Sequence, residues 1–387
     1  MLIVAMNNIK KIPLILFLLW TSLSVTSFSA ELETKHKKIN QLLEHVVLPN
    51  GPGIQYIAVN KKDVVFSRSI GLADIKNKAP LTLSHTMTAF SMTKTLTAIA
   101  VLQLVEQGKI DLNSKASSYI EHPYGSEITI RQLLSHTSGV PDPIPLRWVH
   151  LASTQNSFDE KKALSEVLVE NSQTDYLPGE EYGYSNIGYW LLGNIIEKVS
   201  AQSYRDYVNE NIFDVLGLSR SEIGFEIVNE NNHAKGYLKK YSFMNLVKYF
   251  LLSKNIWGEY EGSWLHIKNV YLNGPAFGGA IGSASAFARI LQDLLNSHSV
   301  LLGKAVKQQL YSQQILKSGQ SIDMTLGWHI GEMDGKKYYY KEGGGAGMHC
   351  EMRVYPEYDL ASVIMVNRTS FNTRKHLSEL DMNIIGQ

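Results

Sequence analysis

The spacing of apolar positions changes along the chain and predicts a different kind of element in each stretch. Residues 36–48 carry apolar side chains at helical spacing, and two strand-like runs follow at 54–59 and 64–70. Residues 93–107 are apolar or small on almost every side and stop at Gly108. This pattern predicts a buried helix that ends at a glycine.

The middle of the chain has a different character from its two ends. Helical patterns dominate from Ile110 to about Pro275, at 130–135, 158–169, 187–199 and 204–212. Beyond Gly278-Gly279 the chain shows a helix at 286–295, strand-like runs at 326–330, 337–340, 349–355 and 360–366, and a final helix from Phe371. Strands at both ends of the chain around a helical middle are typical of an α+β protein.

We therefore predict an antiparallel sheet flanked by helices and built from both termini. Residues 31–109 and 276–387 would form this sheet domain, and residues 110–275 would form an inserted all-helical domain. The active site would lie in the cleft between the two domains.

The N-terminal residues have the pattern of a secretory signal peptide. Lys10 and Lys11 precede an apolar run from Ile12 to Trp20, and small residues follow up to Ala30. The run is short for a membrane span, which takes about 20 residues. We expect residues 1–30 to be removed on export, so that the mature protein is periplasmic or secreted and has no stable membrane span.

Charge and composition narrow the range of partners and cofactors. The net charge of +1 argues against nucleic-acid binding. The single cysteine, Cys350, excludes an internal disulfide and fits a buried strand position. His122, His136 and His150 lack the spacing of metal ligands, and we predict neither a metal nor another cofactor. The expected partner is a small ester, amide or peptide substrate.

A candidate nucleophile lies at the start of the predicted buried helix. Ser91-Met-Thr-Lys94 is the chain's Ser-x-x-Lys, and a spacing of three residues brings both side chains to one helix face. A serine hydroxyl needs a neighbouring base before it attacks a carbonyl. Lysine serves as that base only if burial or a nearby positive charge lowers its pKa. The apolar neighbours of Lys94 predict such burial. Taken alone the motif is weak, because a chain this long contains one by chance.

Three motifs in order give the chain a resemblance to a known superfamily. Phe90-Ser-Met-Thr-Lys94, Arg131-Gln-Leu-Leu-Ser-His-Thr-Ser-Gly139 and Tyr184-Ser-Asn-Ile-Gly-Tyr189 resemble serine β-lactamases and penicillin-binding proteins. The branch that looks most similar contains class C β-lactamases, D-Ala-D-Ala carboxypeptidases and family VIII-type esterases. The resemblance runs from about residue 36 to 385 and implies a cofactor-free serine hydrolase that acts through an acyl-enzyme.

The resemblance also implies roles for other residues. Tyr184 would relay the proton between nucleophile and leaving group, and Asn186 would orient substrate and lysine. Lys341-Glu-Gly-Gly344 matches the family's third element, Lys/His-Thr-Gly, although a second register places Glu342 at the cationic position. Lys341 would keep Tyr184 acidic, with a lowered phenol pKa, and Lys94 neutral.

The same third element supplies the remaining site predictions. The backbone amides of Ser91 and Gly344 would hold the oxyanion, and Gly343 would let the substrate approach the strand. Glu342 replaces a threonine that often binds a substrate carboxylate in the family. If its side chain faces the cleft, it repels such a carboxylate and favours neutral esters or amides over β-lactams and D-Ala peptides.

Two alternatives stay open. A catalytically weak penicillin-binding-like protein would also share these motifs, although a binding module has no need of Ser91, Lys94, Tyr184, Asn186 and Lys341 together. The aromatic-rich stretch 237–271 is best explained by ordinary packing in the helical domain, although an apolar acyl pocket or a membrane contact also fits it.

Overall fold

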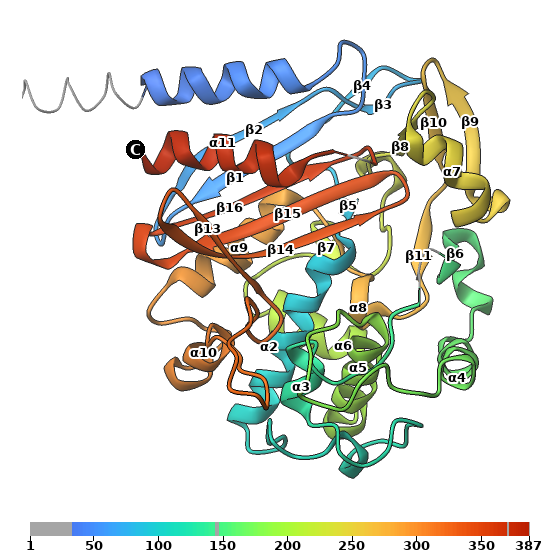
Figure 1. Ribbon diagram of the computed structural model, residues 1–387. Coiled ribbons are helices and arrows are strands. Elements are labelled where there is room, and N and C mark those ends of the chain that lie inside the picture. The colour runs from blue at the N-terminus through green and yellow to red at the C-terminus, as the bar shows by residue number, and fades with distance from the viewer. Residues whose placement is uncertain (1–32, 144–146, 370, 387) are drawn as a thin grey trace, which may run out of the picture.

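The computed structural model describes residues 33–143, 147–369 and 371–386, so the predicted signal peptide lies outside the described residues (Figure 1). Its centre is a six-stranded antiparallel sheet in the order β13-β14-β15-β16-β1-β2. The strands are β1 (Ile54–Val59), β2 (Val64–Ile70), β13 (His329–Met333), β14 (Lys336–Gly345), β15 (Met348–Tyr355) and β16 (Leu360–Val366). Both ends of the chain thus contribute to one sheet, as predicted.

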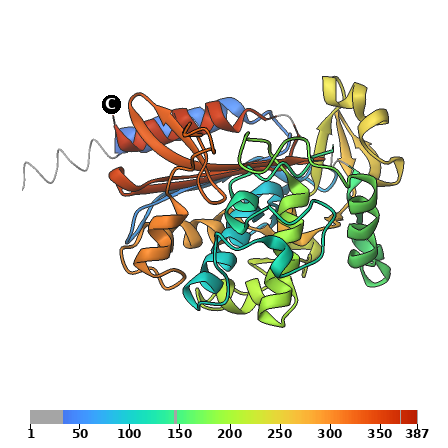
Figure 2. The ribbon, with the colours of Figure 1, turned by 60° about the horizontal axis from the view of Figure 1, so that its bottom comes forward.

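Helices cover both faces of this sheet (Figure 2). A helix at 33–46 and α11 (Thr373–Ile385) lie on one face, where Tyr56 and Ala58 of β1 join their apolar side chains in one cluster. The alternate residues Ile57 and Val59 belong to the main core on the other face. Since successive strand residues point to opposite faces, β1 is buried on both, and its one polar side chain, Gln55, donates to the carbonyl oxygens of Thr82 and His85.

The main core surrounds α2 (Thr93–Glu106), in which every residue from Thr93 to Leu104 is buried. Gly108 follows with a φ of +70°, a conformation that stops a helix at little cost to glycine. The other helices are α3 (Ile130–Leu134), α4 (Glu160–Glu170), α5 (Asn186–Ser200), α6 (Tyr204–Val208), α7 (Phe243–Leu251), α8 (Pro275–Gly278), α9 (Ala284–Leu295) and α10 (Lys304–Leu310). The predicted α+β class with an antiparallel sheet is therefore confirmed.

The inserted segment is not all-helical, which corrects one part of the prediction. Its strands β8 (Gly236–Lys239), β10 (Trp264–Ile267) and β9 (Trp257–Glu261) form a small antiparallel sheet. Two further strands, β6 (Val149–Leu151) and β11 (Val270–Leu272), pair with each other. These strands have three to five residues, too short to show a clear alternation in sequence.

The remaining short strands form one three-stranded and one two-stranded pairing. They are β3 (Leu72–Asp74), β4 (Ala79–Pro80), β5 (Met87–Thr88), β7 (Ile223–Gly224) and β12 (Ile281–Gly282). Strand β12 pairs with both β5 and β7, which ties the residues just before α2 to the inserted segment. No helix within the described ranges is long and apolar enough to cross a membrane.

Candidate active site

Ser91 lies in the short 3-10 helix η1 (Phe90–Met92) that leads directly into α2. Phe90, just before it, has a φ of +45°, which is uncommon for a residue with a side chain. Such strain persists only where the surrounding packing holds it, and it concentrates at functional sites. The Phe90 ring is buried and fills the space that a Cβ on Gly345 would need.

Strand β14 approaches η1 closely because glycines replace side chains there. A Cβ on Gly343 would come within 2.2 Å of the Ala89 carbonyl oxygen and 3.1 Å of the Ser91 nitrogen. Gly343 therefore places the strand against the nucleophile and leaves no room for a substrate beside its own Cα. The neighbouring Gly344 lines the cavity at Ser91, where the sequence predicts the second oxyanion amide.

Two side chains converge on the Ser91 hydroxyl. The Tyr184 hydroxyl donates to Ser91 Oγ at 2.7 Å, and Lys94 Nζ lies 3.2 Å from the same oxygen. Lys94 Nζ also donates to Asn186 Oδ1 at 2.6 Å and to the Phe277 carbonyl oxygen at 2.7 Å. A neutral amine has two hydrogens and one lone pair. The two carbonyl oxygens use the hydrogens, which leaves the lone pair for the Ser91 proton.

Electrostatics favour this neutral form of Lys94. Its side chain is fully buried, and burial together with the charge of Lys341 lowers the pKa of Lys94 well below its ordinary value. Burial likewise lowers the pKa of Lys341 to about 7. Both Nζ atoms lie over the Tyr184 ring, Lys94 at 4.8 Å and Lys341 at 5.1 Å from its centroid. The predicted depression of the Lys94 pKa is present.

The prediction of an acidic Tyr184 is wrong for the free site. Burial raises the pKa of the Tyr184 phenol above its ordinary value, and this effect outweighs the hydrogen bond with Ser91. The low dielectric around the ring penalises a phenolate more than the two nearby lysines can stabilise it. Tyr184 therefore keeps its proton and can donate it.

Glu342 also lies differently from the expectation that made it a substrate-binding residue. Lys341 points toward Tyr184, whereas Glu342, the next strand residue, contacts His349, whose Nε2 lies 2.7 Å from Glu342 Oε1. The hydrogen bond with His349 lowers the pKa of the Glu342 carboxyl group. Glu342 does not line the cavity at Ser91, so the repulsion argument against carboxylate-bearing substrates loses its basis.

Asp142, which was not predicted from the sequence, holds Asn186 in place. Both the backbone N–H and the side-chain Nδ2 of Asn186 donate to Asp142 Oδ1, at 2.9 and 3.0 Å. These bonds fix the amide so that its oxygen faces Lys94. Burial raises the pKa of Asp142. The sequence offered one indication of Asp142: it lies three residues after the Ser-His-Thr-Ser-Gly motif, between Pro141 and Pro143.

His136 shapes the loop that carries Tyr184. Its Nδ1 accepts from the Ser185 N–H at 3.1 Å, and its carbonyl oxygen accepts from the Gly183 N–H at 2.9 Å. The His136 and Tyr184 rings lie 4.4 Å apart. Ser185 then caps α5 through the Gly188 N–H. The fully buried His136 thus acts as a support for the loop.

His329 is a second residue of the site that was not predicted. Its Nε2 lies 3.5 Å from Lys341 Nζ, and burial lowers the pKa of the imidazole. In the sequence His329 directly follows Leu326-Gly-Trp328. Cys350 is buried on β15 against the Ala89 carbonyl, as predicted for a structural residue.

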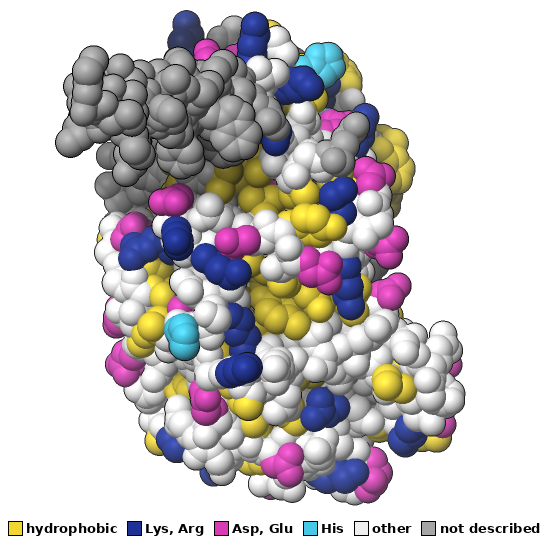
Figure 3. Space-filling model, turned by 90° about the vertical axis from the view of Figure 1, so that its left-hand side faces the viewer, with side chains coloured by type: hydrophobic (Ala, Val, Ile, Leu, Met, Phe, Trp, Pro, Cys, Tyr) yellow, Lys and Arg dark blue, Asp and Glu magenta, His cyan; other side chains and the backbone are white. Residues whose placement is uncertain are grey.

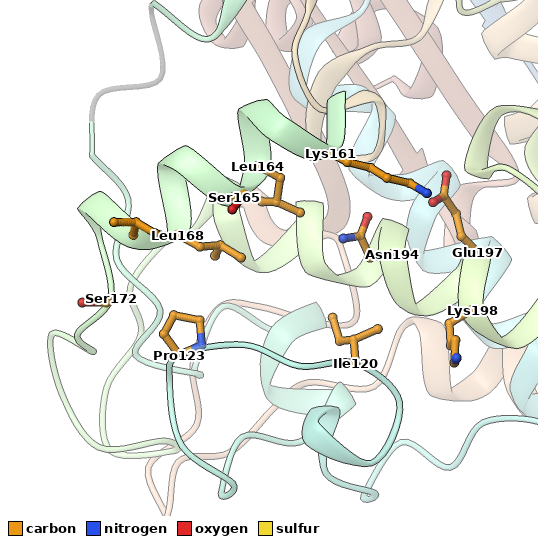
Figure 4. Close-up of a pocket in the computed structure, with 11 residues that line it drawn as sticks. Ile120, Pro123, Lys161, Leu164, Ser165, Leu168, Ser172, Asn194, Glu197 and Lys198 are labelled. Atoms are coloured by element: carbon orange, nitrogen blue, oxygen red, sulfur yellow. The ribbon is translucent and has the colours of Figure 1, made fainter. Parts of the chain in front are cut away.

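Cavities of different size and polarity lie at this site and elsewhere on the molecule. The cavity at Ser91 has a volume of about 250 Å³, and its far wall is apolar, formed by Val149, Leu252, Ile256, Val270, Leu272 and Phe277. A polar cavity of about 640 Å³ adjoins Lys341 through His329 and contains Arg374 and Tyr182. A larger groove of about 850 Å³ between α4 and α5 contains none of the predicted site residues (Figure 4).

A serine flanked by a buried lysine of lowered pKa and a protonated tyrosine is the arrangement expected of a serine hydrolase. The chain belongs to the beta-lactamase family. The family model described as Beta-lactamase matches residues 39–382 of the chain. Penicillin-binding protein 4* of Bacillus subtilis (strain 168) is 26% identical over 319 residues, which are 81% of this chain and 67% of that protein.

Solved structures share the fold at low sequence identity. The octameric penicillin-binding protein homologue from Pyrococcus abyssi superposes with a TM-score of 0.72 at 21% identity, covering 94% of this chain and 77% of that one. The D-amino acid amidase from Ochrobactrum anthropi SV3, complexed with D-phenylalanine, gives a TM-score of 0.71 at 18% identity, covering 91% and 99%.

Proposed function

We propose that the protein is an exported hydrolase that cleaves an ester or amide through an acyl-enzyme on Ser91. The observation that carries this proposal is the convergence of Tyr184 and Lys94 on Ser91 Oγ, at 2.7 and 3.2 Å. Neutral Lys94 takes the serine proton, and Ser91 attacks the substrate carbonyl. The amides of Ser91 and Gly344 would stabilise the oxyanion that forms.

The same groups then expel the leaving group and release the acyl-enzyme. Tyr184 gives its proton to the leaving group and recovers one from Lys94, so the phenol works as a neutral proton relay. Water activated by the same pair then releases the acyl group. Asn186 holds the lysine in place, and Lys341 keeps the pKa of Lys94 low.

The apolar wall of the Ser91 cavity supports an apolar acyl group on the substrate. Six apolar side chains face the serine there, and Asp142 is the single acidic residue among the lining residues within the described part of the chain. The D-amino acid amidase of similar fold was solved with D-phenylalanine, whose apolar side chain lies next to its carboxyl group. Export rests on the signal-peptide pattern of residues 1–30.

A second candidate, a D-Ala-D-Ala-type carboxypeptidase, is favoured by the polar cavity beside Lys341. Arg374 in that cavity offers a guanidinium that suits a substrate carboxylate. The side-chain contacts of Glu342 remove the sequence-based objection to such substrates.

One set of assays separates these functions from a catalytically weak binding protein. With p-nitrophenyl butyrate we expect a burst of nitrophenol that Ser91→Ala abolishes. Turnover of this ester is then compared with that of nitrocefin and a D-Ala-D-Ala peptide. Faster turnover of the peptide would favour the carboxypeptidase. No burst, and no covalent label from a fluorophosphonate, would exclude the enzyme.

A further inference from the structure

Helix α7 exposes an apolar face to solvent. Phe243, Leu246 and Phe250 are 75%, 72% and 76% exposed, and their spacing of three and four residues places them on one side of the helix. Tyr241 and Tyr249, 83% and 60% exposed, flank that face. Phe243 and Phe250 are the only exposed phenylalanines within the described ranges.

The opposite side of α7 is firmly held, so this exposure is not the result of a loosely packed helix. Lys248 is buried, with its Nζ 3.1 Å from the Tyr260 hydroxyl and 4.9 Å from the centroid of the Trp257 ring. Met244 and Leu251 pack against a small apolar cluster of this lobe. The contacts on the opposite side therefore fix α7 in an orientation that exposes its apolar face to solvent.

The lobe that carries α7 is also basic. Residues 237–272 contain five lysines and two glutamates, a formal charge of +3 in a chain whose total is +1. Of the glutamates, Glu261 is buried in an ion pair with Lys235 at 3.0 Å. The exposed lysines are 239, 240, 254 and 268. Arg147 adds a further cation, donating to the Phe250 carbonyl oxygen at 2.8 Å.

This lobe also forms a wall of the active site. Leu252, the residue after α7, lines the Ser91 cavity and a neighbouring cavity of about 260 Å³. Met244 of α7 lines the second of these, and the two cavities share Gly344, Gly345 and Ala346. In Figures 1 and 2 the lobe with α7 and β9 lies at the outer edge of the molecule, away from α10.

We propose that the α7 face, formed by Tyr241, Phe243, Leu246, Tyr249 and Phe250, docks on an anionic lipid bilayer. Aromatic and aliphatic side chains surrounded by lysines are the composition of helices that lie in the membrane interface. Lysines near such a surface are attracted by acidic headgroups. Docking there places the wall of the Ser91 cavity at the lipid surface.

Charge argues against a second copy of the chain as the occupant. A two-fold pairing of α7 faces would bring two identical basic rims together, and like charges at an interface oppose association. The face of the molecule opposite the lobe carries side chains of both signs intermixed, in contrast to the basic rim around α7 (Figure 3).

Vesicle sedimentation tests this proposal independently of Ser91 chemistry. Protein purified after export, with one common N-terminus in all variants, is mixed with phosphatidylglycerol or phosphatidylcholine vesicles. We expect binding to phosphatidylglycerol that falls at least tenfold in Phe243→Ser/Phe250→Ser. It should also fall in Lys239→Ser/Lys240→Ser and at high salt. The control Val300→Ser/Ile315→Ser changes two side chains that are 64% and 65% exposed elsewhere and should bind as the wild type does.

The outcomes distinguish lipid docking from self-association, from misfolding and from a failure of the hydrolase proposal. Ser91→Ala should bind vesicles unchanged, so a failed hydrolase proposal would leave the docking result intact. Circular dichroism and thermal melting establish that each variant is folded. The proposal is overturned if the wild type stays in the supernatant or if the phenylalanine variant binds equally well. It is also overturned if light scattering shows an oligomer that this variant dissociates.

Discussion

Two clusters of buried charged side chains lie on opposite faces of the same sheet, and they differ in whether each charge has a partner. Beneath α11, Arg353 donates to Glu351 at 2.7 Å, and Asp381 accepts from the Tyr56 and Tyr355 hydroxyls at 2.9 Å each. Beneath β14, Lys94 and Lys341 are equally buried, and no carboxylate lies within ion-pair distance of either among the described residues.

The pKa values show what this difference does. Burial alone lowers the pKa of Arg353, but the carboxylate of Glu351 outweighs it and keeps the guanidinium charged. Burial lowers the pKa of Lys94 and of Lys341, and the carboxylate of Asp142 offsets only a small part of this effect at Lys94. Burial thus accompanies a structural ion pair on one face of the sheet and the proposed base on the other.

The largest expected effect comes from removing the base. Lys94→Met keeps the volume of the buried side chain but removes the amine, and we expect kcat to fall about 10³-fold, within the range for a general base. Thermal melting should show a folded protein. The exposed Lys198→Met serves as control. Near wild-type turnover in Lys94→Met would exclude Lys94 as base.

Breaking the paired cluster should instead affect stability. Arg353→Met leaves Glu351 buried without its partner, and we expect the free energy of unfolding in urea to drop by about 3–5 kcal/mol. The kcat of the folded protein should stay close to wild type, since Arg353 lies on the far face of the sheet from Ser91. Adding Glu351→Gln should recover part of the loss. A stable but inactive Arg353→Met would contradict the division of roles.

The charge of Lys341 should be visible in the pH profile. Protonated Lys341 lowers the pKa of Lys94, so Lys341→Met raises that pKa. The base then becomes neutral only at higher pH, and the acidic limb of kcat/KM should move upward by about one pH unit. An unchanged limb, or one at lower pH, would show that Lys341 does not act on Lys94.

Asp142 should shift the same limb in the opposite direction, by a smaller amount. Its carboxylate raises the pKa of Lys94, so Asp142→Asn lowers it and moves the acidic limb to lower pH. The substituted amide keeps one acceptor oxygen but no charge, so the two hydrogen bonds to Asn186 should weaken and kcat should fall about tenfold, as expected for a positioning residue. Equal shifts in the same direction for both variants would contradict the electrostatic account.

Much of the central sheet could be predicted from sequence, because β1 and β16 are buried along their whole length and β2 is a run of strand-forming residues between a turn and Gly71. The prediction of an all-helical inserted domain was wrong because strands such as β8, β9 and β10 are too short to give a clear pattern. The proposed nucleophile Ser91, Lys94 and Tyr184 were singled out through motifs, and the structure brings their side chains together. Asp142 was not, because its role depends on a contact across 44 residues with Asn186.

The errors in the site came from quantities that sequence does not contain. The pKa of Tyr184 depends on how deeply the ring is buried, and proximity of two lysines alone gave the wrong direction. The orientation of Glu342 depends on the strand's register against β15, which places it beside His349.

The central claim, that a buried lysine with no carboxylate at ion-pair distance activates Ser91, is tested most directly by labelling. Intact-protein mass spectrometry follows fluorophosphonate addition between pH 5 and 10 in wild type, Ser91→Ala and Lys94→Met. We predict a single adduct on Ser91 that forms more slowly as falling pH protonates Lys94, and near-complete loss of labelling in both variants. Rapid labelling of Lys94→Met with an unchanged pH profile would contradict this claim.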